Sequence, residues 1–228
     1  MTSTAILIPT RYNSSRFPGK PLCDLGGKTM IERVYDACAS SGFDTYVLTD
    51  DRRIFNLIPD RHAWIDETQD YSNGTERCAG AIVHSPLLQD YEQFVNVQGD
   101  MPDVTQEMIE KTIWHLKNYS VTTMCAMMPK EQQNDPNTVK LVRAADKCLW
   151  FGRGITGYGD WHLGIYGYKR NALEMYPDLT GTREERIEGL EQLRWLKNGW
   201  DIGVLPVQFD GIEINAPEDA EKWNMKNE

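Results

Sequence analysis

Four side chains near the N-terminus could together bind a phosphate group: Arg11, Ser14, Arg16 and Lys20. They lie in a loop that follows the short apolar run Ala5–Ile8. Arginine offers phosphate oxygens a planar fork of N–H donors, and lysine offers a point charge. A small, cationic loop at the end of a buried strand holds phosphate in many α/β proteins, whereas an ordinary exposed loop would leave these side chains in water. Because this loop is basic in a chain of net charge −10, we favour the phosphate site.

A carboxylate, Asp100, follows a second apolar run, Phe94–Val97, with Gly99 before it and Pro102 close behind. This order predicts that Asp100 lies at the carboxyl end of a core strand. Ligands of open α/β folds bind at that edge of the sheet. The alternative is an aspartate that caps a turn or a helix.

The segment Asp70–Arg77 combines a turn with the start of a helix. Asn73 and Gly74 are typical turn residues, and Thr75 can cap a helix over residues 76–83. The unpaired N–H groups at the start of such a helix could bind a polar ligand, although surface turns that lead into helices are common.

The elements that would position these residues alternate over the first 120 residues. Apolar spacing predicts strands at 5–8, 45–49, 63–66 and 94–97, and helices at 29–41, 53–58, 76–83 and 107–119. Such alternation predicts parallel strands with right-handed crossovers. The next stretch is richer in strands, which we expect to be antiparallel, at 121–128, 138–144, 148–151 and, with a bulge at its glycines, 162–168.

The last part of the chain predicts a single helix over residues 183–198, a strand at 202–207 and a terminal helix whose first turn holds Pro217. The first of these helices would turn Ile187 and three leucines inward, with Glu191 and Gln192 at the edge of the apolar stripe. The whole pattern predicts one domain over residues 1–228. Its fold class is α/β and doubly wound, with a mostly parallel sheet and an antiparallel, strand-rich insertion.

Composition narrows the class of protein. Of the 228 residues, 40% are hydrophobic and 25% charged, as in soluble globular proteins. The five cysteines are odd in number and widely spaced, which predicts reduced thiols and a cytoplasmic location rather than disulfides or a zinc site. We expect no membrane association, since no apolar run approaches the length of a span and no signal peptide is evident. The acidic balance argues against nucleic acid as a partner.

With these residues in view, the chain resembles the 3-deoxy-manno-octulosonate (Kdo) cytidylyltransferases, or CMP-Kdo synthetases, which are sugar nucleotidyltransferases. The resemblance runs along nearly the whole chain, in motifs that keep the family's order: IPTRYNSSRFPGKPL, LTDDRRI, NGTER, VNVQGD, DPNTVKLV, HLGIYGY and LEQLRWLKNG. It implies a Rossmann-like nucleotidyltransferase fold. It also implies transfer of a cytidylyl group from CTP to the anomeric hydroxyl of an acidic sugar, release of pyrophosphate, and use of Mg²⁺.

The resemblance also assigns roles by position. It places the triphosphate at Arg11, Ser14, Arg16 and Lys20, and other nucleotide contacts at Asn73, Gly74, Arg77 and Gln98. It places the sugar at Gln98, His162, Tyr166, Glu191 and Gln192. The catalytic set would be Arg11, Lys20 and the metal ligand Asp100, acting by positioning and charge neutralisation. For His162, the alternative is a core histidine held by hydrogen bonds. Residues 121–200 would form the sugar-binding and dimer-forming region of a homodimer.

The chain departs from the family pattern on the sugar side. The family's terminal motif, Val-Asp-Thr-Pro-Glu-Asp, reads Ile-Asn-Ala-Pro-Glu-Asp here, which puts Asn215 at the second metal position. Asn215 can coordinate through its carbonyl oxygen but brings no charge. Glu213 lies two residues earlier and would share its face in an extended segment, so our hypothesis is that Glu213 or water fills this role. The segment Gly154–Trp161 is also shorter than in the family.

These departures keep two other functions open. The short segment allows the same chemistry on a different acceptor sugar. Asn215 allows a nucleotide-binding relative with impaired catalysis that serves a regulatory or assembly role. A dinucleotide-binding oxidoreductase is disfavoured, because no GxGxxG motif follows the first strand.

Overall fold

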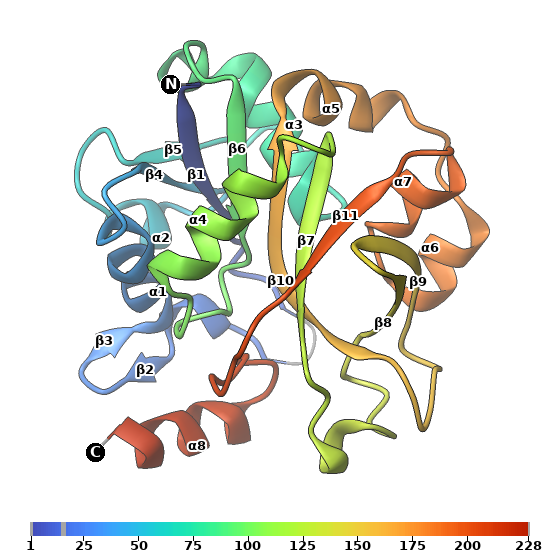
Figure 1. The fold of residues 1–228 in the computed structure, drawn as a ribbon. Coiled ribbons are helices and arrows are strands. Elements are labelled where there is room, and N and C mark those ends of the chain that lie inside the picture. Colours follow the sequence, from blue (N-terminus) through green and yellow to red (C-terminus); the bar gives the residue numbers. More distant parts are fainter. Residues whose placement is uncertain (1, 15–16, 228) are drawn as a thin grey trace.

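One mixed sheet runs through the protein, and its strands follow the order β5-β4-β1-β6-β10-β7-β11-β9-β8 (Figure 1). The structure is a computed structural model that describes residues 2–14 and 17–227. The strands of this sheet are β1 (Thr4–Pro9), β4 (Asp44–Thr49), β5 (Ala63–Ile65), β6 (Gln93–Val97), β7 (Val121–Ala126), β8 (Lys140–Ala144), β9 (Lys147–Gly152), β10 (Asp160–Lys169) and β11 (Ile202–Pro206).

The first half of the sheet is parallel, as the alternation of strand and helix predicts. Strand β1 pairs in parallel with both β4 and β6, and β4 pairs in parallel with β5. The carboxyl ends of these strands therefore meet at one edge of the sheet.

The second half is where the sheet becomes mixed. Strand β10 runs antiparallel to β6, β7 and β8, and β8 runs antiparallel to β9, as expected for this stretch. The register of β10 against β7 shifts between Leu163 and Tyr166, which confirms the bulge predicted at its glycines. Strand β11 lies parallel to β7 but antiparallel to β9. Because most pairs in this half are antiparallel, the expectation of a mostly parallel sheet is correct only for the half that contains β1.

Helices cover both faces of the sheet, which explains why the central strands are apolar on both sides. The helices are α1 (Met30–Ala39), α2 (Arg52–Phe55), α3 (Gly74–His84), α4 (Gln106–His115), α5 (Arg170–Met175), α6 (Arg183–Glu188), α7 (Leu193–Lys197) and α8 (Pro217–Asn227). Ala5 and Leu7 of β1 pack in a core with α3, α5 and α7. Ile6 and Ile8 point the other way, toward α1, α2 and α4.

The C-terminal helix α8 lies beside a small hairpin formed by β2 (Asp24–Leu25) and β3 (Lys28–Thr29) (Figure 1). Trp223 of α8 packs in a separate apolar cluster with Leu25 and Met30. Its indole N–H donates a hydrogen bond of 2.7 Å to Asp103 Oδ1. The chain's last helix is thereby attached to the loop that follows β6. Among the residues described, no helix combines the length and the apolar character that crossing a membrane would need.

The start of α3 differs from the prediction. The helix begins two residues earlier than predicted, and its N-cap is Asn73 rather than Thr75, because Asn73 Oδ1 accepts the Glu76 N–H at 2.9 Å. Helix α4 turns Trp114 outward, where the side chain is 54% exposed.

The helix predicted over residues 183–198 is two helices. Gly189 follows α6 with φ of 61°, a left-handed conformation that suits glycine and ends a helix. Residues 189–192 then link α6 to α7. The prediction was wrong because the apolar spacing continues through the link. As a result, Ile187 is 69% exposed instead of facing inward.

Candidate active site

A cavity of about 350 Å³ lies at the carboxyl edge of the parallel half of the sheet. The loops that follow β1 and β6 supply much of its wall, and the turn before α3 supplies another part. Nine of the residues expected at the site from the sequence line this one cavity: Arg11, Ser14, Lys20, Asn73, Gly74, Arg77, Gln98, Asp100 and Glu191. Arg16 belongs to the same predicted set but lies outside the described residues.

Lys20 and Asp100 form an ion pair inside this cavity. Lys20 begins a short 3₁₀ turn, Lys20–Leu22, directly after Gly19, whose φ of 71° favours glycine. Lys20 Nζ lies 2.6 Å from Asp100 Oδ2 and also donates to the carbonyl oxygen of Ile214 at 3.0 Å. The side chains of the pair are only 15% and 27% exposed. The loop after β1, the loop after β6 and the segment before α8 therefore converge on one ammonium group.

Arg77 is a buried cation in the wall of the same cavity, with 4% of its side chain exposed. Its Nη2 lies 2.7 Å from Asp50 Oδ2, at the carboxyl end of β4. The guanidinium carbon lies 5.3 Å from the ring centre of Tyr71, a cation–π contact. Its Nη1 has no hydrogen-bond partner among the described residues. A buried donor without a partner is costly, and this nitrogen is itself withdrawn from the cavity surface.

The backbone N–H groups at the start of α3 are not available to a ligand, contrary to the possibility that the sequence left open. Those of Gly74 and Thr75 donate to the two carboxylate oxygens of Glu191, at 3.0 and 3.1 Å. Burial raises the pKa of Glu191, and these hydrogen bonds oppose that shift. Gly74 is closely packed, since a Cβ there would lie 3.0 Å from Gln98 Nε2 and 3.2 Å from Pro9 Cγ, so a larger residue would need these side chains to shift.

The other three residues expected at the sugar do not line this cavity. His162 is 5% exposed, its Nε2 lies 3.1 Å from Thr123 Oγ1, and its ring contacts Phe151 edge-on. Burial, with a smaller effect of Arg153, lowers the pKa of His162 to about 3. These are properties of the core histidine that was the alternative interpretation. Tyr166 and Gln192 are also buried, at 4% and 3% exposed.

Near Asp100 the structure places Glu213 rather than Asn215. Glu213 Oε1 accepts the Gly164 N–H at 3.3 Å, and the next residue, Ile214, donates its N–H to the Asp100 carbonyl oxygen at 3.0 Å. Burial and then the neighbouring Asp100 carboxylate raise the pKa of Glu213 to about 8. Neither Glu213 nor Asn215 lines the cavity itself, and the Asn215 N–H donates to Asp219 Oδ2 at 3.0 Å.

The described residues do not form a complete metal site. Nowhere in residues 2–14 and 17–227 do three or more His, Cys, Asp or Glu side chains gather as metal ligands. A cation bound between Asp100 and Glu213 would need further oxygen ligands from a substrate or from water. Mg²⁺ is commonly bound in this way, through one or two carboxylates together with phosphate oxygens.

Sequence reasoning missed several residues that shape the cavity. Thr10 and Tyr71 line it, and Asp50 holds Arg77 in its wall. Asp50 follows a predicted strand, so its position at the sheet edge could have been inferred from the same argument as that for Asp100. No pattern in the sequence identifies Tyr71 in this way, because its stacking on Arg77 depends on how the loop before α3 folds back.

Comparison with known proteins agrees with this geometry. The family model described as Cytidylyltransferase matches residues 5–202. The 8-amino-3,8-dideoxy-manno-octulosonate cytidylyltransferase of Shewanella halifaxensis is 38% identical in an alignment that covers 95% of each chain. The 3-deoxy-manno-octulosonate cytidylyltransferase of Parabacteroides distasonis is 35% identical, over 95% of this chain and 94% of the relative.

A solved structure supports the same comparison at the level of the fold. The structure of CMP:2-keto-3-deoxy-manno-octonic acid synthetase complexed with CTP superimposes on this chain with a TM-score of 0.87. The two chains are 29% identical, and the match covers 99% of this chain and 98% of the other.

Proposed function

This chain belongs to the cytidylyltransferase family, and from that premise we propose that it transfers the cytidylyl group of CTP to the anomeric hydroxyl of 3-deoxy-manno-octulosonate. The products are the CMP-sugar and pyrophosphate. The observation that carries the proposal is that the Lys20–Asp100 pair and the partly unpaired Arg77 line one cavity at the carboxyl edge of the sheet.

The reaction needs positioning and charge neutralisation more than covalent catalysis. The anomeric oxygen of the sugar bonds to the α-phosphorus of CTP, and the bond from that phosphorus to the β-phosphate oxygen breaks. Arg11, Arg16 and Lys20 neutralise the triphosphate and the leaving pyrophosphate, while Ser14 donates to a phosphate oxygen. Asn73, Gly74 and Arg77, which line the cavity, bind the cytidine part.

The donor set beside Lys20 fits a divalent cation. Asp100 and Glu213 are neighbouring carboxyl groups, and burial together with the Asp100 charge raises the pKa of Glu213 to about 8. A cation bound beside them would favour the charged form of Glu213. Mg²⁺, when bound, would stabilise the charge on the phosphate oxygens and the leaving group. We assign Asp100 as its ligand and Glu213 as the second carboxylate of the site. In this assignment Asn215 contributes at most a neutral oxygen ligand.

The proposal for the acceptor sugar rests on the resemblance and on the names of the relatives. Of the residues that the resemblance assigns to the sugar, Gln98 and Glu191 line the cavity, whereas His162, Tyr166 and Gln192 are buried and do not line it. The relative from Shewanella halifaxensis carries the name of an 8-amino-sugar cytidylyltransferase, so the 8-amino form of the sugar is the second candidate acceptor. Both sugars share the anomeric hydroxyl at which the chemistry occurs.

We further propose that the protein is a single-domain homodimer of the cytoplasm, in which residues 121–200 supply the sugar pocket and the contact with a second copy. Apolar side chains in this region are open to solvent, among them Leu149 at 52%, Tyr158 at 64% and Ile187 at 69% exposed. The described cysteines are all free thiols, in keeping with a reducing compartment. Sedimentation equilibrium would test the dimer, because a monomeric mass at micromolar concentration would contradict it.

One assay tests the function and its alternatives. The protein is incubated with each nucleoside triphosphate, Mg²⁺ and either Kdo or 8-amino-Kdo, and pyrophosphate release is followed. We expect release with CTP and Kdo. Release only with the 8-amino sugar would assign the second acceptor. Tight CTP binding without release for any sugar would favour a nucleotide-binding relative that has lost catalysis.

A further inference from the structure

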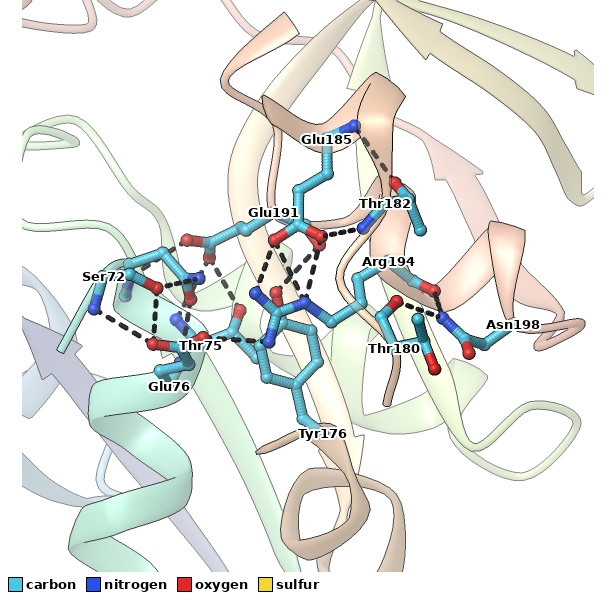
Figure 2. Close-up of polar contacts among 12 residues, drawn as sticks. Ser72, Thr75, Glu76, Tyr176, Thr180, Thr182, Glu185, Glu191, Arg194 and Asn198 are labelled. Atoms are coloured by element: carbon cyan, nitrogen blue, oxygen red, sulfur yellow. Dashed lines mark hydrogen bonds and ion pairs between the residues drawn. The ribbon is translucent and has the colours of Figure 1, made fainter. Parts of the chain in front are cut away.

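The turn that leads into α3 is held by side chains from the opposite side of the cavity. The Glu191 carboxylate accepts hydrogen bonds from the Gly74 N–H at 3.0 Å, from the Thr75 N–H at 3.1 Å and from Thr75 Oγ1 at 2.6 Å (Figure 2). A carboxylate at a helix N-terminus is also favoured by the helix dipole. Glu191 therefore closes the start of α3 with both of its oxygens.

A second link runs in parallel with the first. Arg194 of α7 forms a buried ion pair with Glu185 of α6, at 2.6 Å, and its Nη1 reaches Glu76 of α3 at 2.9 Å (Figure 2). Glu76 in turn accepts the N–H of Ser72 at 3.0 Å, and its carboxylate also accepts the Ser72 hydroxyl. The residues on both sides of Asn73 are thus fixed to the α6–α7 segment.

The break at Gly189 makes this arrangement possible. In an unbroken helix, Glu191 would lie at the edge of the apolar stripe that faces the core. In the link between α6 and α7 it instead points toward α3, and Tyr176 holds the link by donating its hydroxyl to the Glu191 carbonyl oxygen at 3.0 Å.

We propose that Glu191 is a positioning residue that holds the turn Ser72–Gly74 in the conformation that binds the nucleotide, rather than a contact to the sugar. The inference rests on the proposed function, in which Asn73, Gly74 and Arg77 bind the cytidine part of CTP. Three of the roughly four acceptor positions of the Glu191 carboxylate are already used within the protein, which leaves little capacity for sugar hydroxyls.

The same contacts have a consequence for the phosphates. The negative charge of Glu191 lies where an anion would otherwise bind the N–H groups of α3. The triphosphate is therefore excluded from this helix terminus and must bind on the other side of the cavity, at Arg11, Ser14 and Lys20.

The test compares Glu191→Gln with Glu184→Gln, a control in α6 whose side chain pairs with Lys197 on the surface. In Glu191→Gln an amide group would replace one acceptor and face an N–H donor. We expect this variant to bind CTP more weakly, on the order of tenfold by titration calorimetry, with a matching rise in the KM for CTP. The KM for the sugar at saturating CTP should not change, and the control should behave as the wild type.

A second pair of variants keeps the test informative if Glu191→Gln folds poorly. Thr75→Val removes the hydroxyl that donates to Glu191 and should weaken CTP binding in the same direction, whereas Thr75→Ser keeps the hydroxyl and should restore it.

Three results would overturn the inference, and they are distinguishable. A higher KM for the sugar with unchanged CTP affinity would make Glu191 a sugar contact. A lower thermal midpoint with unchanged CTP affinity would make its role purely structural. If the wild-type protein bound no CTP, the proposed function would fail, and this inference would fail with it.

Discussion

Lys20 Nζ and Asp100 Oδ2 lie 2.6 Å apart in a cavity where both side chains are largely withdrawn from water. Lys28 and Asp36 form a pair of the same length on the surface, where both side chains are 50% exposed. Exposed pairs of this kind are screened by water and contribute little to stability. Only the first pair lies where a triphosphate and a metal ion could use its charges, and it is the first target for mutation.

Asp100→Asn should reduce CTP-dependent pyrophosphate release by about a hundredfold or more, because the amide removes the charge that would hold the metal and orient Lys20. Steady-state kinetics with Kdo would measure the effect, with circular dichroism to confirm folding. Asp36→Asn is the matched control and should keep wild-type rates. Undiminished release by Asp100→Asn would remove this residue from the catalytic set.

Glu213→Gln should weaken metal binding by about tenfold or more, since it removes the second carboxylate beside Asp100. Electron paramagnetic resonance of Mn²⁺ in the presence of CTP measures this directly, without turnover. Adding Asn215→Asp to this variant should restore affinity if a carboxylate at either position can serve the ion. Metal affinity and turnover that are both insensitive to Glu213→Gln would assign the site to Asp100 alone.

The buried His162 should lower the free energy of unfolding as the pH falls below 6.5. Burial lowers the pKa of His162 in the folded protein to about 3, from an ordinary value of 6.5. Between these values the unfolded chain binds a proton that the folded chain does not, so stability is retained above pH 6.5 and lost as the pH falls toward 3. The slope reaches at most about 1.4 kcal/mol per pH unit.

Urea titrations at pH 7, 6, 5 and 4 would measure this acid dependence. His162→Gln should flatten that part of the profile, whereas the exposed His84→Gln should leave it unchanged. Identical profiles for the wild type and His162→Gln would show that other groups cause the acid sensitivity.

Arg194→Ala should lower the free energy of unfolding by about 3 kcal/mol, because Glu185 would be left as a buried charge without its partner. The control is Arg52→Ala, which breaks the surface pair with Glu67, where the side chains are 74% and 45% exposed, and should change the free energy of unfolding much less. Chemical denaturation of both variants gives the comparison. Equal losses would mean that burial of the Arg194 pair has no special effect.

The parallel half of the sheet, and the positions of Asp100 and of the basic loop after β1 at its carboxyl edge, could be predicted from the sequence. The period of apolar residues shows which side of each element faces the core, and parallel strands joined by helices necessarily place their carboxyl ends at one edge. For the same reason the sequence correctly expected Arg11, Lys20 and Asp100 to lie close together, although Lys20 and Asp100 are 80 residues apart.

Other features were decided by the tertiary structure alone. The apolar stripe over residues 183–198 continues through the break at Gly189, so periodicity could not reveal that Glu191 leaves the helix and caps α3 across 117 residues of chain. Periodicity also could not distinguish a sugar-binding His162 from one enclosed by β7 and β9. Local sequence encodes which face of an element is buried, but which side chains meet in that buried space depends on how separate elements pack together.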